Sequence, residues 1–253
     1  MSDDQGGMIP DRYQRQTAFG PIGPEGQARL ARGRVAIIGM GALGTAIANS
    51  LARAGTGFIR LVDSDRVEES NLQRQMLFDE ADAASHCYKA QAASRHLHAI
   101  NSSITTEPVV VRADESNIEA LIAGVDVVLD GADNFDIRYL ANDACRRRGI
   151  PWIYGGVLAD AGATMNVLPD GGPCLRCLVP APPDPGSFST PEQAGVLNQI
   201  TAVIGSIEAL EAMKVLVGSP DVRRTLLVID LWCSSFRQID VERNPACPIC
   251  GGH

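Results

Sequence analysis

The sequence predicts an α/β fold in which a mostly parallel sheet is flanked by helices and extended by antiparallel strands. Up to residue 150, apolar β-branched runs alternate with segments of helical periodicity. Beyond that point, residues 153–168 form two apolar runs with no helix between them. Parallel strands are covered by helices on both faces, so they appear as continuous apolar runs. Two strands without an intervening helix indicate an antiparallel pair.

The elements follow in order along the chain. We predict a helical N-terminal arm over residues 1–33 and a single domain over residues 34–253. The predicted strands are 34–38, 58–62, 105–111, 125–129, 225–230 and 236–241, with two more inside 153–168. The predicted helices are 89–100, 135–148 and 196–217, and a further helical pattern runs through Leu51 and Ala54. Residues 180–194 are rich in Pro, Ser and Gly, which predicts an exposed mobile loop.

Composition excludes several classes of protein. The chain has 253 residues, of which 45% are hydrophobic and 21% charged, as in ordinary globular domains. Its net charge of −8 argues against nucleic acid as a partner. No apolar run approaches the roughly 20 residues that span a bilayer, and Met1–Pro10 lacks the order of a signal peptide. We therefore expect a cytoplasmic protein without a membrane partner.

A glycine fingerprint follows the first predicted strand. Gly39 and Gly41 allow a tight turn and close approach of a phosphate, while Gly44 lets the next helix pack on the strand. The N-terminus of that helix offers N–H groups to an anion. Asp63 lies about twenty residues further on, where a carboxylate can bond a ribose hydroxyl. This order predicts a Rossmann-like, nucleotide-binding unit.

A second group of residues is suited to a reacting phosphate. Arg74 and Lys89 could converge on an ATP α-phosphate, and Asn71 could donate to a phosphate oxygen. Asp133 follows a predicted strand at its carboxyl end and is a natural Mg²⁺ ligand beside a triphosphate. In the alternative reading, Arg74 and Lys89 are surface charges, and Asp133 and Asn134 cap the following helix.

The third group is a pair of Cys-x-x-Cys knuckles at 174–177 and 247–250. Cys174, Cys177, Cys247 and Cys250 supply the four thiolates of a closed, structural Zn²⁺ site. A redox role for one Cys-x-x-Cys pair is the competing interpretation.

Short segments between residue 12 and residue 250 match, in order, the motifs of a known protein family. The matching segments are 12–16 (RYQRQ), 39–44 (GMGALG), 61–65 (LVDSD), 70–75 (SNLQRQ), Lys89, 130–134 (DGADN), 142–145 (NDAC), 154–156 (YGG), 173–177 (PCLRC), 194–195 (AG), 204–206 (IGS) and 247–250 (CPIC). The chain resembles the MoeB/ThiF (HesA) family of adenylyltransferases, which are related to ubiquitin-activating enzymes. The resemblance implies that residues 34–253 form one nucleotide-binding adenylation domain.

The resemblance also implies roles for individual residues. Asp63 binds the ribose of ATP, Asn71, Arg74 and Lys89 hold its phosphates, and Asp133 binds Mg²⁺. Asp65, Ser70 and Asn134 lie on the matching segments and complete the implied nucleotide site, together with Gly39, Gly41 and Gly44. Arg15 matches an arginine that reaches the triphosphate from the neighbouring subunit. The implied catalytic set is therefore Arg15, Arg74, Lys89 and Asp133, in a homodimer.

The activity implied is ATP-dependent adenylation of the C-terminal Gly-Gly carboxylate of a ubiquitin-like sulfur carrier of the MoaD or ThiS type. The products are an acyl-adenylate and pyrophosphate, and an external persulfide donor can then complete thiocarboxylate formation. The carrier could serve molybdopterin, thiamine or specialised metabolism. Two other functions are compatible with parts of the sequence: an NAD(P)-dependent oxidoreductase, and a non-catalytic zinc module that binds a carrier.

One segment departs from the family. Several members carry a cysteine shortly before the position of Ala194, where this chain has Thr190 and Pro191, neither of which can be a thiolate nucleophile. The remaining free thiols are Cys87, Cys145 and Cys233. We expect Cys145 to be a core residue.

Overall fold

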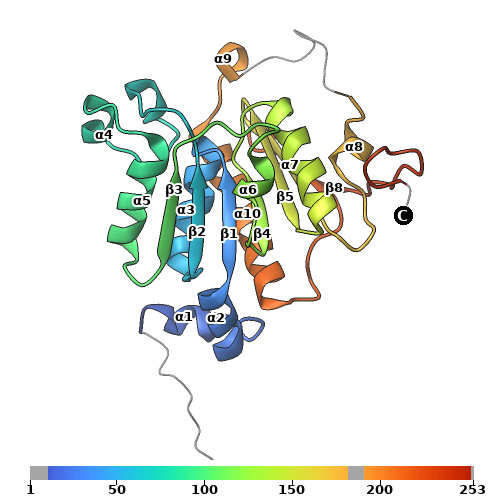
Figure 1. Cartoon of the computed structure of the whole chain (residues 1–253), viewed down its shortest axis with the longest axis horizontal. Helices are drawn as coiled ribbons and strands as arrows, with labels where there is room; N and C mark the ends of the chain where they lie inside the picture. Colours follow the sequence, from blue (N-terminus) through green and yellow to red (C-terminus); the bar gives the residue numbers. More distant parts are fainter. Residues whose placement is uncertain (1–10, 182–190, 252–253) are drawn as a thin grey trace, which may run out of the picture.

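The computed structural model describes residues 11–181 and 191–251, apart from the side chains of residues 191 and 192, and its strands form a single sheet (Figure 1). The strands are β1 (Arg34–Ile38), β2 (Phe58–Val62), β3 (Thr105–Val109), β4 (Val127–Asp130), β5 (Trp152–Leu158), β6 (Ala161–Val167), β7 (Leu226–Asp230) and β8 (Ser235–Ile239). The helices are η1 (Asp11–Tyr13), α1 (Gln14–Thr17), α2 (Gly23–Arg32), α3 (Ala42–Ala54), η2 (Glu69–Asn71), α4 (Glu80–Ala84), α5 (Lys89–Ile100), α6 (Ile118–Leu121), α7 (Phe135–Arg148), α8 (Leu175–Leu178), α9 (Pro191–Ala194) and α10 (Asn198–Val217).

The sheet has the order β3-β2-β1-β4-β5-β6-β7-β8. The pairings from β3 to β5 are parallel, and those from β5 to β8 are antiparallel. The predicted fold class is therefore confirmed, including the antiparallel extension that the helix-free segment 153–168 predicted.

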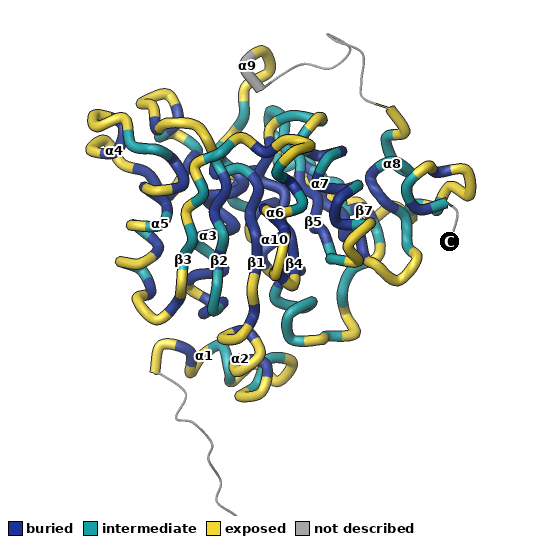
Figure 2. Tube along the Cα trace, in the orientation of Figure 1, coloured by how far each residue is buried: buried dark blue, intermediate teal, exposed yellow. Residues whose placement is uncertain are grey.

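Alternate residues of β1 pack into two separate hydrophobic cores, one on each face of the sheet. Val35 and Ile37 belong to a cluster with α3, α5 and α10, whereas Ala36 and Ile38 belong to a cluster with α6 and α7. Successive side chains of a strand point to opposite faces, so a strand covered on both faces is apolar throughout. Figure 2 shows the central strands buried, with exposed residues concentrated in the loops and on the outer helix surfaces.

Several elements differ from the predicted bounds. β4 starts at Val127 rather than Val125, and β3 ends at Val109 rather than Val111. The carboxylate of Asp126 accepts the Arg34 N–H at 2.8 Å, which ties the segment before β4 to the start of β1. The short helices α4, α6 and α8 were not predicted, because four or five residues are too few for a helical period.

The described part of the N-terminal arm docks at the edge where the parallel strands begin (Figure 1). The side-chain amides of Gln16 and Gln27 both donate to the Ala54 carbonyl oxygen at the end of α3, at 2.9 and 3.0 Å. These bonds satisfy a carbonyl that has no partner inside the helix. The arm is thus fixed to the edge of the sheet opposite the glycine turn.

Within residues 11–181 and 191–251, no helix combines the length and the apolar character that a membrane crossing requires.

Candidate nucleotide site and metal centre

The loops after β1, β2 and β4 meet at the edge of the sheet where the parallel strands end (upper edge in Figure 1). The chain runs outward from β1 to β2 and β3 and then returns to β4 on the other side of β1. Ligands of open α/β sheets bind at the carboxyl ends of the strands where the order reverses in this way.

Glycines form the turn between β1 and α3 because side chains have no room there. Gly39 has a φ of +98°, and a Cβ at this position would lie 2.4 Å from the Gly131 carbonyl oxygen. A Cβ on Gly44 would lie 2.0 Å from the Gly39 carbonyl oxygen. Gly41 differs, because the atoms nearest to its Cβ position are 3.9 and 4.0 Å away. A Cβ on Gly41 would therefore make only ordinary van der Waals contacts, at a helix N-terminus whose N–H groups favour an anion.

Asp63, directly after β2, holds the glycine turn in place. Its Oδ2 accepts the Met40 N–H at 2.7 Å, and its Oδ1 accepts the Asp65 N–H at 2.7 Å. Burial raises the pKa of the Asp63 carboxyl, and the two N–H groups and the Lys89 charge oppose that rise. The residue predicted to bind a ribose is thus also a clamp between the end of β2 and the glycine turn.

Lys89 begins α5 with its side chain largely buried. Its Nζ lies 3.1 Å from Asp65 Oδ2, and its backbone N–H donates to the Asp65 carbonyl oxygen at 2.8 Å. A buried ammonium needs a partner, and the exposed Asp65 carboxylate supplies one. Asp65, which was predicted at the nucleotide site, is therefore the counter-charge of Lys89.

The polar run Ser70–Gln75 forms the turn that begins with η2. Asn71 is buried, and its Oδ1 accepts the Glu68 N–H at 3.3 Å as part of a reciprocal capping box. Arg74 is half-buried, and its Nη1 donates to the Ser70 carbonyl oxygen at 3.0 Å. Asn71 therefore shapes the turn, a role that the sequence analysis did not include.

Asp133 and Asn134 follow β4 and have separate tasks. Asn134 Oδ1 accepts the Ile137 N–H at 3.0 Å, which makes Asn134 the N-cap of α7. Its Nδ2 donates to Asp133 Oδ1 at 3.0 Å. The Asp133 side chain is exposed at the carboxyl edge, where it can reach a ligand. The helix cap considered in the alternative reading therefore comes from Asn134 alone.

A buried ion pair between Asp130 and Arg138 stabilises the segment that leads to Asp133. Arg138 Nε lies 3.0 Å from Asp130 Oδ2, and Arg138 Nη2 donates to the carbonyl oxygens of Ala132 and Gly155 at 2.9 and 3.0 Å. Asp130 Oδ1 accepts the Ala132 N–H at 3.0 Å. Burial raises the pKa of Asp130 to about 6, against the opposing charge of Arg138.

Glu208 of α10 is a second buried carboxyl beside this ion pair. Neither of its oxygens has a hydrogen-bond partner among the described residues, and burial raises its pKa well above the ordinary value. A Cβ on Gly155 would lie 2.0 Å from Glu208 Oε1, so the glycine makes room for the carboxyl. Sequence reasoning missed this cluster, because residues on α7, β5 and α10 meet only in the folded chain.

Hydrogen bonds and an ion pair connect Asp63, Asp65 and Lys89 to the glycine turn. Asp63 contacts the glycine turn, Asp65 contacts Lys89, and Gln75 at the end of the polar run lies beside Gly41. Arg15 is not brought there. It lies exposed on α1, at the opposite edge of the sheet (Figure 1).

The four knuckle cysteines form a separate centre near the C-terminus. Their Sγ atoms all lie within 4.8 Å of one another, with Cys174 and Cys247 at 3.7 Å and Cys177 and Cys250 at 3.4 Å. Four sulfurs about 2.3 Å from a tetrahedral Zn²⁺ would be separated by about 3.8 Å, so these thiols fit a metal ion. The metal site predicted from the two knuckles is therefore present in the fold.

The other cysteines occupy different surroundings. Cys145 is fully buried, as expected, and burial raises the pKa of its thiol. Cys87 is half-buried with its Sγ 3.2 Å from Ser85 Oγ, and Cys233 is exposed. The prediction for the loop at Thr190 falls outside the described residues, as does most of the predicted mobile segment 180–194. Pro191 begins α9.

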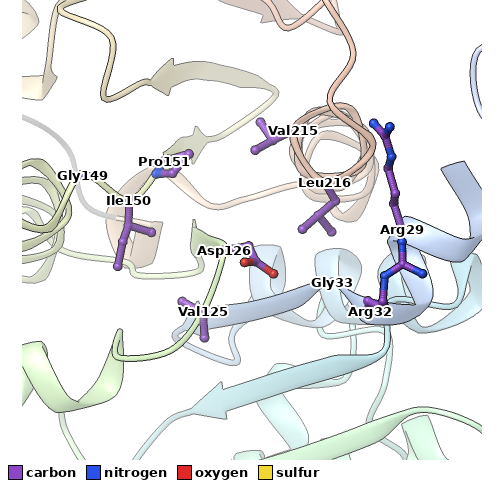
Figure 3. Close-up of a pocket in the computed structure, with 10 residues that line it drawn as sticks. All are labelled: Arg29, Arg32, Gly33, Val125, Asp126, Gly149, Ile150, Pro151, Val215 and Leu216. Carbon is purple, nitrogen blue, oxygen red and sulfur yellow. The ribbon is translucent and has the colours of Figure 1, made fainter.

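Hollows lined by described residues also occur outside the glycine turn, and two of them are large enough to note. One is near the carboxyl edge and is lined by Gln73, Ala159, Asp160, Ala194, Gly195, Val196, Leu197 and Trp232. The other, shown in Figure 3, is lined by Arg29, Arg32, Gly33, Val125, Asp126, Gly149, Ile150, Pro151, Val215 and Leu216. The second hollow lies at the edge where β1, β4 and β5 begin, so it is remote from the predicted nucleotide site.

The fold and the site define an α/β protein with a glycine turn at the carboxyl edge of its sheet and a cluster of four cysteines that fits a metal ion. The chain belongs to the ThiF family, whose family model matches residues 13–249.

Individual relatives agree with this assignment. A SAMP-activating enzyme E1 of Haloferax volcanii is 40% identical over 242 residues, which cover 95% of this chain and 88% of that protein. A sulfur carrier protein adenylyltransferase of Thermus thermophilus is 40% identical over 247 residues, covering 95% of this chain and 90% of that protein. The crystal structure of E. coli MccB with ATP has a TM-score of 0.81 at 23% identity, covering 96% of this chain and 75% of that one. At this identity the crystal structure bears on the fold alone.

Proposed function

We propose that this chain transfers AMP from ATP to the C-terminal Gly-Gly carboxylate of a ubiquitin-like sulfur carrier protein. The observation that carries the proposal is the meeting of the glycine turn, Lys89 and the Asp133 loop at one edge of the sheet. Its substrate class is supported by the relatives, which include a sulfur carrier protein adenylyltransferase at 40% identity.

ATP would lie along the carboxyl edge. The turn at Gly39, Gly41 and Gly44 leaves room for phosphates at the N-terminus of α3. Asp63 contacts the same turn, so its carboxylate would lie beside the ribose of a nucleotide bound there. Lys89 and Arg74 supply positive charge to the phosphates. Ser70 and Asn71 hold the turn that carries Arg74, while Asp65 holds Lys89 and Asn134 holds the Asp133 carboxylate.

Asp133 is the residue that would hold Mg²⁺. Its carboxylate is exposed beside the proposed triphosphate, and Mg²⁺ in nucleotide sites takes one or two carboxylates together with phosphate oxygens. When bound, the ion neutralises phosphate charge. Asp130, although close in sequence, is buried and paired with Arg138, so it cannot serve as the ligand.

The reaction needs no base from the protein, because the carrier's carboxylate is already ionised at neutral pH. One carboxylate oxygen attacks the α-phosphorus, and the bond from that phosphorus to the oxygen bridging to the β-phosphate breaks. Pyrophosphate leaves with the electron pair, and the carrier becomes an acyl-adenylate. The protein contributes positioning and charge stabilisation through Arg74 and Lys89. The terminal sulfur of an external persulfide donor then attacks the acyl carbon and displaces AMP, which leaves carrier and donor joined by an S–S bond. A second thiol of the external sulfur source cleaves that bond, forms a disulfide with the donor and releases the thiocarboxylate.

Arg15 would complete the site from a second subunit. Its position at the far edge of the sheet leaves no route to the glycine turn within one chain. A homodimer that places α1 of one subunit against the carboxyl edge of the other would supply this guanidinium to the triphosphate.

The four-cysteine centre would hold Zn²⁺ in a structural role. A closed set of four thiolates leaves no open position for catalysis. It joins the segment at α8 to the C-terminal segment and lies apart from the glycine turn (right side of Figure 1). The cysteines of the described residues are free thiols, which is consistent with a protein that works in the reducing cytoplasm.

ATP–pyrophosphate exchange tests the proposal. Purified MoaD-type and ThiS-type carriers ending in Gly-Gly are added in turn, and we expect exchange with at least one of them. An NAD(P)-dependent oxidoreductase would instead bind NADH and fail to bind ATP. A non-catalytic zinc module would bind a carrier without exchange.

A further inference from the structure

Gln75 is the last residue of the polar turn Ser70–Gln75 that follows β2, and its side chain is buried. Its side chain is only 3% exposed, and its backbone N–H donates to the Asn71 carbonyl oxygen at 3.0 Å. The backbone bond fixes Gln75 one turn after the capping box of η2. The direction of its side chain is therefore set by the same turn that carries Arg74.

The Gln75 amide lies beside Gly41 of the glycine turn. Its Nε2 lies 4.0 Å from the position that a Gly41 Cβ would take, and the Gly131 carbonyl oxygen lies 3.9 Å from the same position. These are the nearest atoms on that side of the glycine turn. One of them is a hydrogen-bond donor and the other an acceptor, and only the donor complements a phosphate oxygen.

The amide is unpaired within the described protein. Gln75 Oε1 is buried without a hydrogen-bond partner among the described residues. Nε2 is not one of the buried unpaired atoms, and it forms no hydrogen bond to another described residue. A buried polar group without a partner destabilises the folded chain. An apolar side chain of the same size would avoid the cost at Oε1, whereas the amide keeps a donor, Nε2, beside the Gly41 turn, where it is free to bond a ligand.

We propose that Gln75 contacts the nucleotide, with its Nε2 donating a hydrogen bond to a phosphate oxygen of ATP held against the Gly41 turn. The inference rests on the proposed adenylation function and adds to it a phosphate donor that is neutral. The roles of Lys89 and Arg74 depend on charge, whereas the role of Gln75 depends on the direction of one N–H bond.

Two substitutions test this role. Gln75→Leu keeps the size of the side chain and removes the donor, and Gln75→Glu places a carboxylate beside the phosphates. Gln91→Leu is the matched control, because Gln91 is exposed on the adjacent helix α5. Each protein is titrated with ATP and Mg²⁺ by calorimetry, assayed for ATP–pyrophosphate exchange with carrier, and melted to verify folding.

We expect Gln75→Leu to raise the Kd and the KM for ATP about tenfold, as for the loss of a hydrogen bond to a charged group, while the KM for the carrier stays constant. We expect Gln75→Glu to weaken ATP binding about a hundredfold through like-charge repulsion. Gln91→Leu should match the wild type.

The inference is overturned if Gln75→Leu melts like the wild type and binds ATP within about twofold of it. It is also overturned if Gln75→Glu binds ATP and Mg²⁺ as tightly as the wild type, since the amide oxygen would then face a cation. Failure of the underlying function looks different, because the wild-type protein itself would show neither ATP binding nor exchange.

Discussion

At the residue scale, Gly41 and Gly44 belong to one turn but serve different purposes. We predict that Gly44→Ala destabilises the fold by about 3 kcal/mol or more, because its Cβ would lie 2.0 Å from the Gly39 carbonyl oxygen. We predict that Gly41→Ala melts within about 2 °C of the wild type but binds ATP at least tenfold more weakly, because its Cβ enters the space left for a phosphate. Thermal melting and ATP titration separate the two effects. Full ATP affinity in Gly41→Ala would contradict this account of the turn.

The sequence could predict those site residues that directly follow a strand, because the position of the strand fixes where they lie in the fold. Gly39, Asp63 and Asp133 each follow a strand, and parallel strands bring their ends to one edge. Asp130, Arg138 and Glu208 could not be found in this way. They lie on three different elements, β4, α7 and α10, which come together only in the folded chain. In addition, a glutamate in a helical pattern is ordinarily exposed, so the sequence does not indicate that Glu208 is buried.

At the scale of elements, α10 carries two buried glutamates whose stability effects should depend on pH with opposite sign. Burial holds the pKa of Glu208 well above its ordinary value of 4.5. The folded chain therefore keeps a proton that the unfolded chain has released, and the free energy of unfolding falls as pH rises through that window. At Glu211 burial also favours the proton, but hydrogen bonds from Lys214, the Arg223 N–H and Asn166 outweigh it and lower the pKa. Glu211 stabilises the fold above its ordinary pKa, and that contribution is lost as pH falls.

We predict that Glu208→Gln gains stability relative to the wild type between pH 5 and pH 7, by up to about 1.4 kcal/mol per pH unit. Glu211→Gln on the same helix is the matched comparison, and its deficit should stay constant from pH 7 to pH 5 and shrink only as the pH falls below the ordinary value of 4.5. Urea unfolding at several pH values from below 4.5 up to 7 measures both dependences. Parallel pH dependences in the two variants would contradict the assignment of proton binding to Glu208.

Element prediction succeeded where the pattern was long and uniform. The strands at 34–38 and 58–62 and the helices at 89–100 and 135–148 have the predicted bounds. The start of β4 was wrong by two residues, because Val125 is apolar but lies before the strand, in the segment that Asp126 ties to Arg34. Hydrophobicity marks burial, which loop residues share with strand residues.

At the scale of the whole molecule, the position of Arg15 makes activity depend on subunit pairing. We predict that Arg15→Ala and Asp133→Ala are each inactive alone, and that dimers reassembled from an equal mixture recover about a quarter of wild-type exchange. Half of those dimers are mixed, and each contains one site in which both residues are intact. No recovery on mixing, with dimers verified by sedimentation, would contradict action between subunits.

The four-cysteine centre should stabilise the molecule without taking part in the reaction. We predict about one zinc per chain by elemental analysis, and a lower melting temperature for Cys250→Ser, whose Sγ lies 3.4 Å from Cys177 Sγ. Well below that temperature, the variant should retain the wild-type KM for ATP, because the centre is remote from the glycine turn. A native protein without bound metal would refute the four-thiolate site.

The most direct test of the central claim is carrier-dependent exchange of pyrophosphate into ATP. With a carrier that ends in Gly-Gly, the wild-type protein should catalyse exchange, and deletion of the last glycine of the carrier should abolish it. Asp133→Ala should fold and melt like the wild type, because its side chain is exposed, yet show no exchange. Near-normal exchange by Asp133→Ala, or no exchange by the wild type with any Gly-Gly carrier of the panel, would contradict the account.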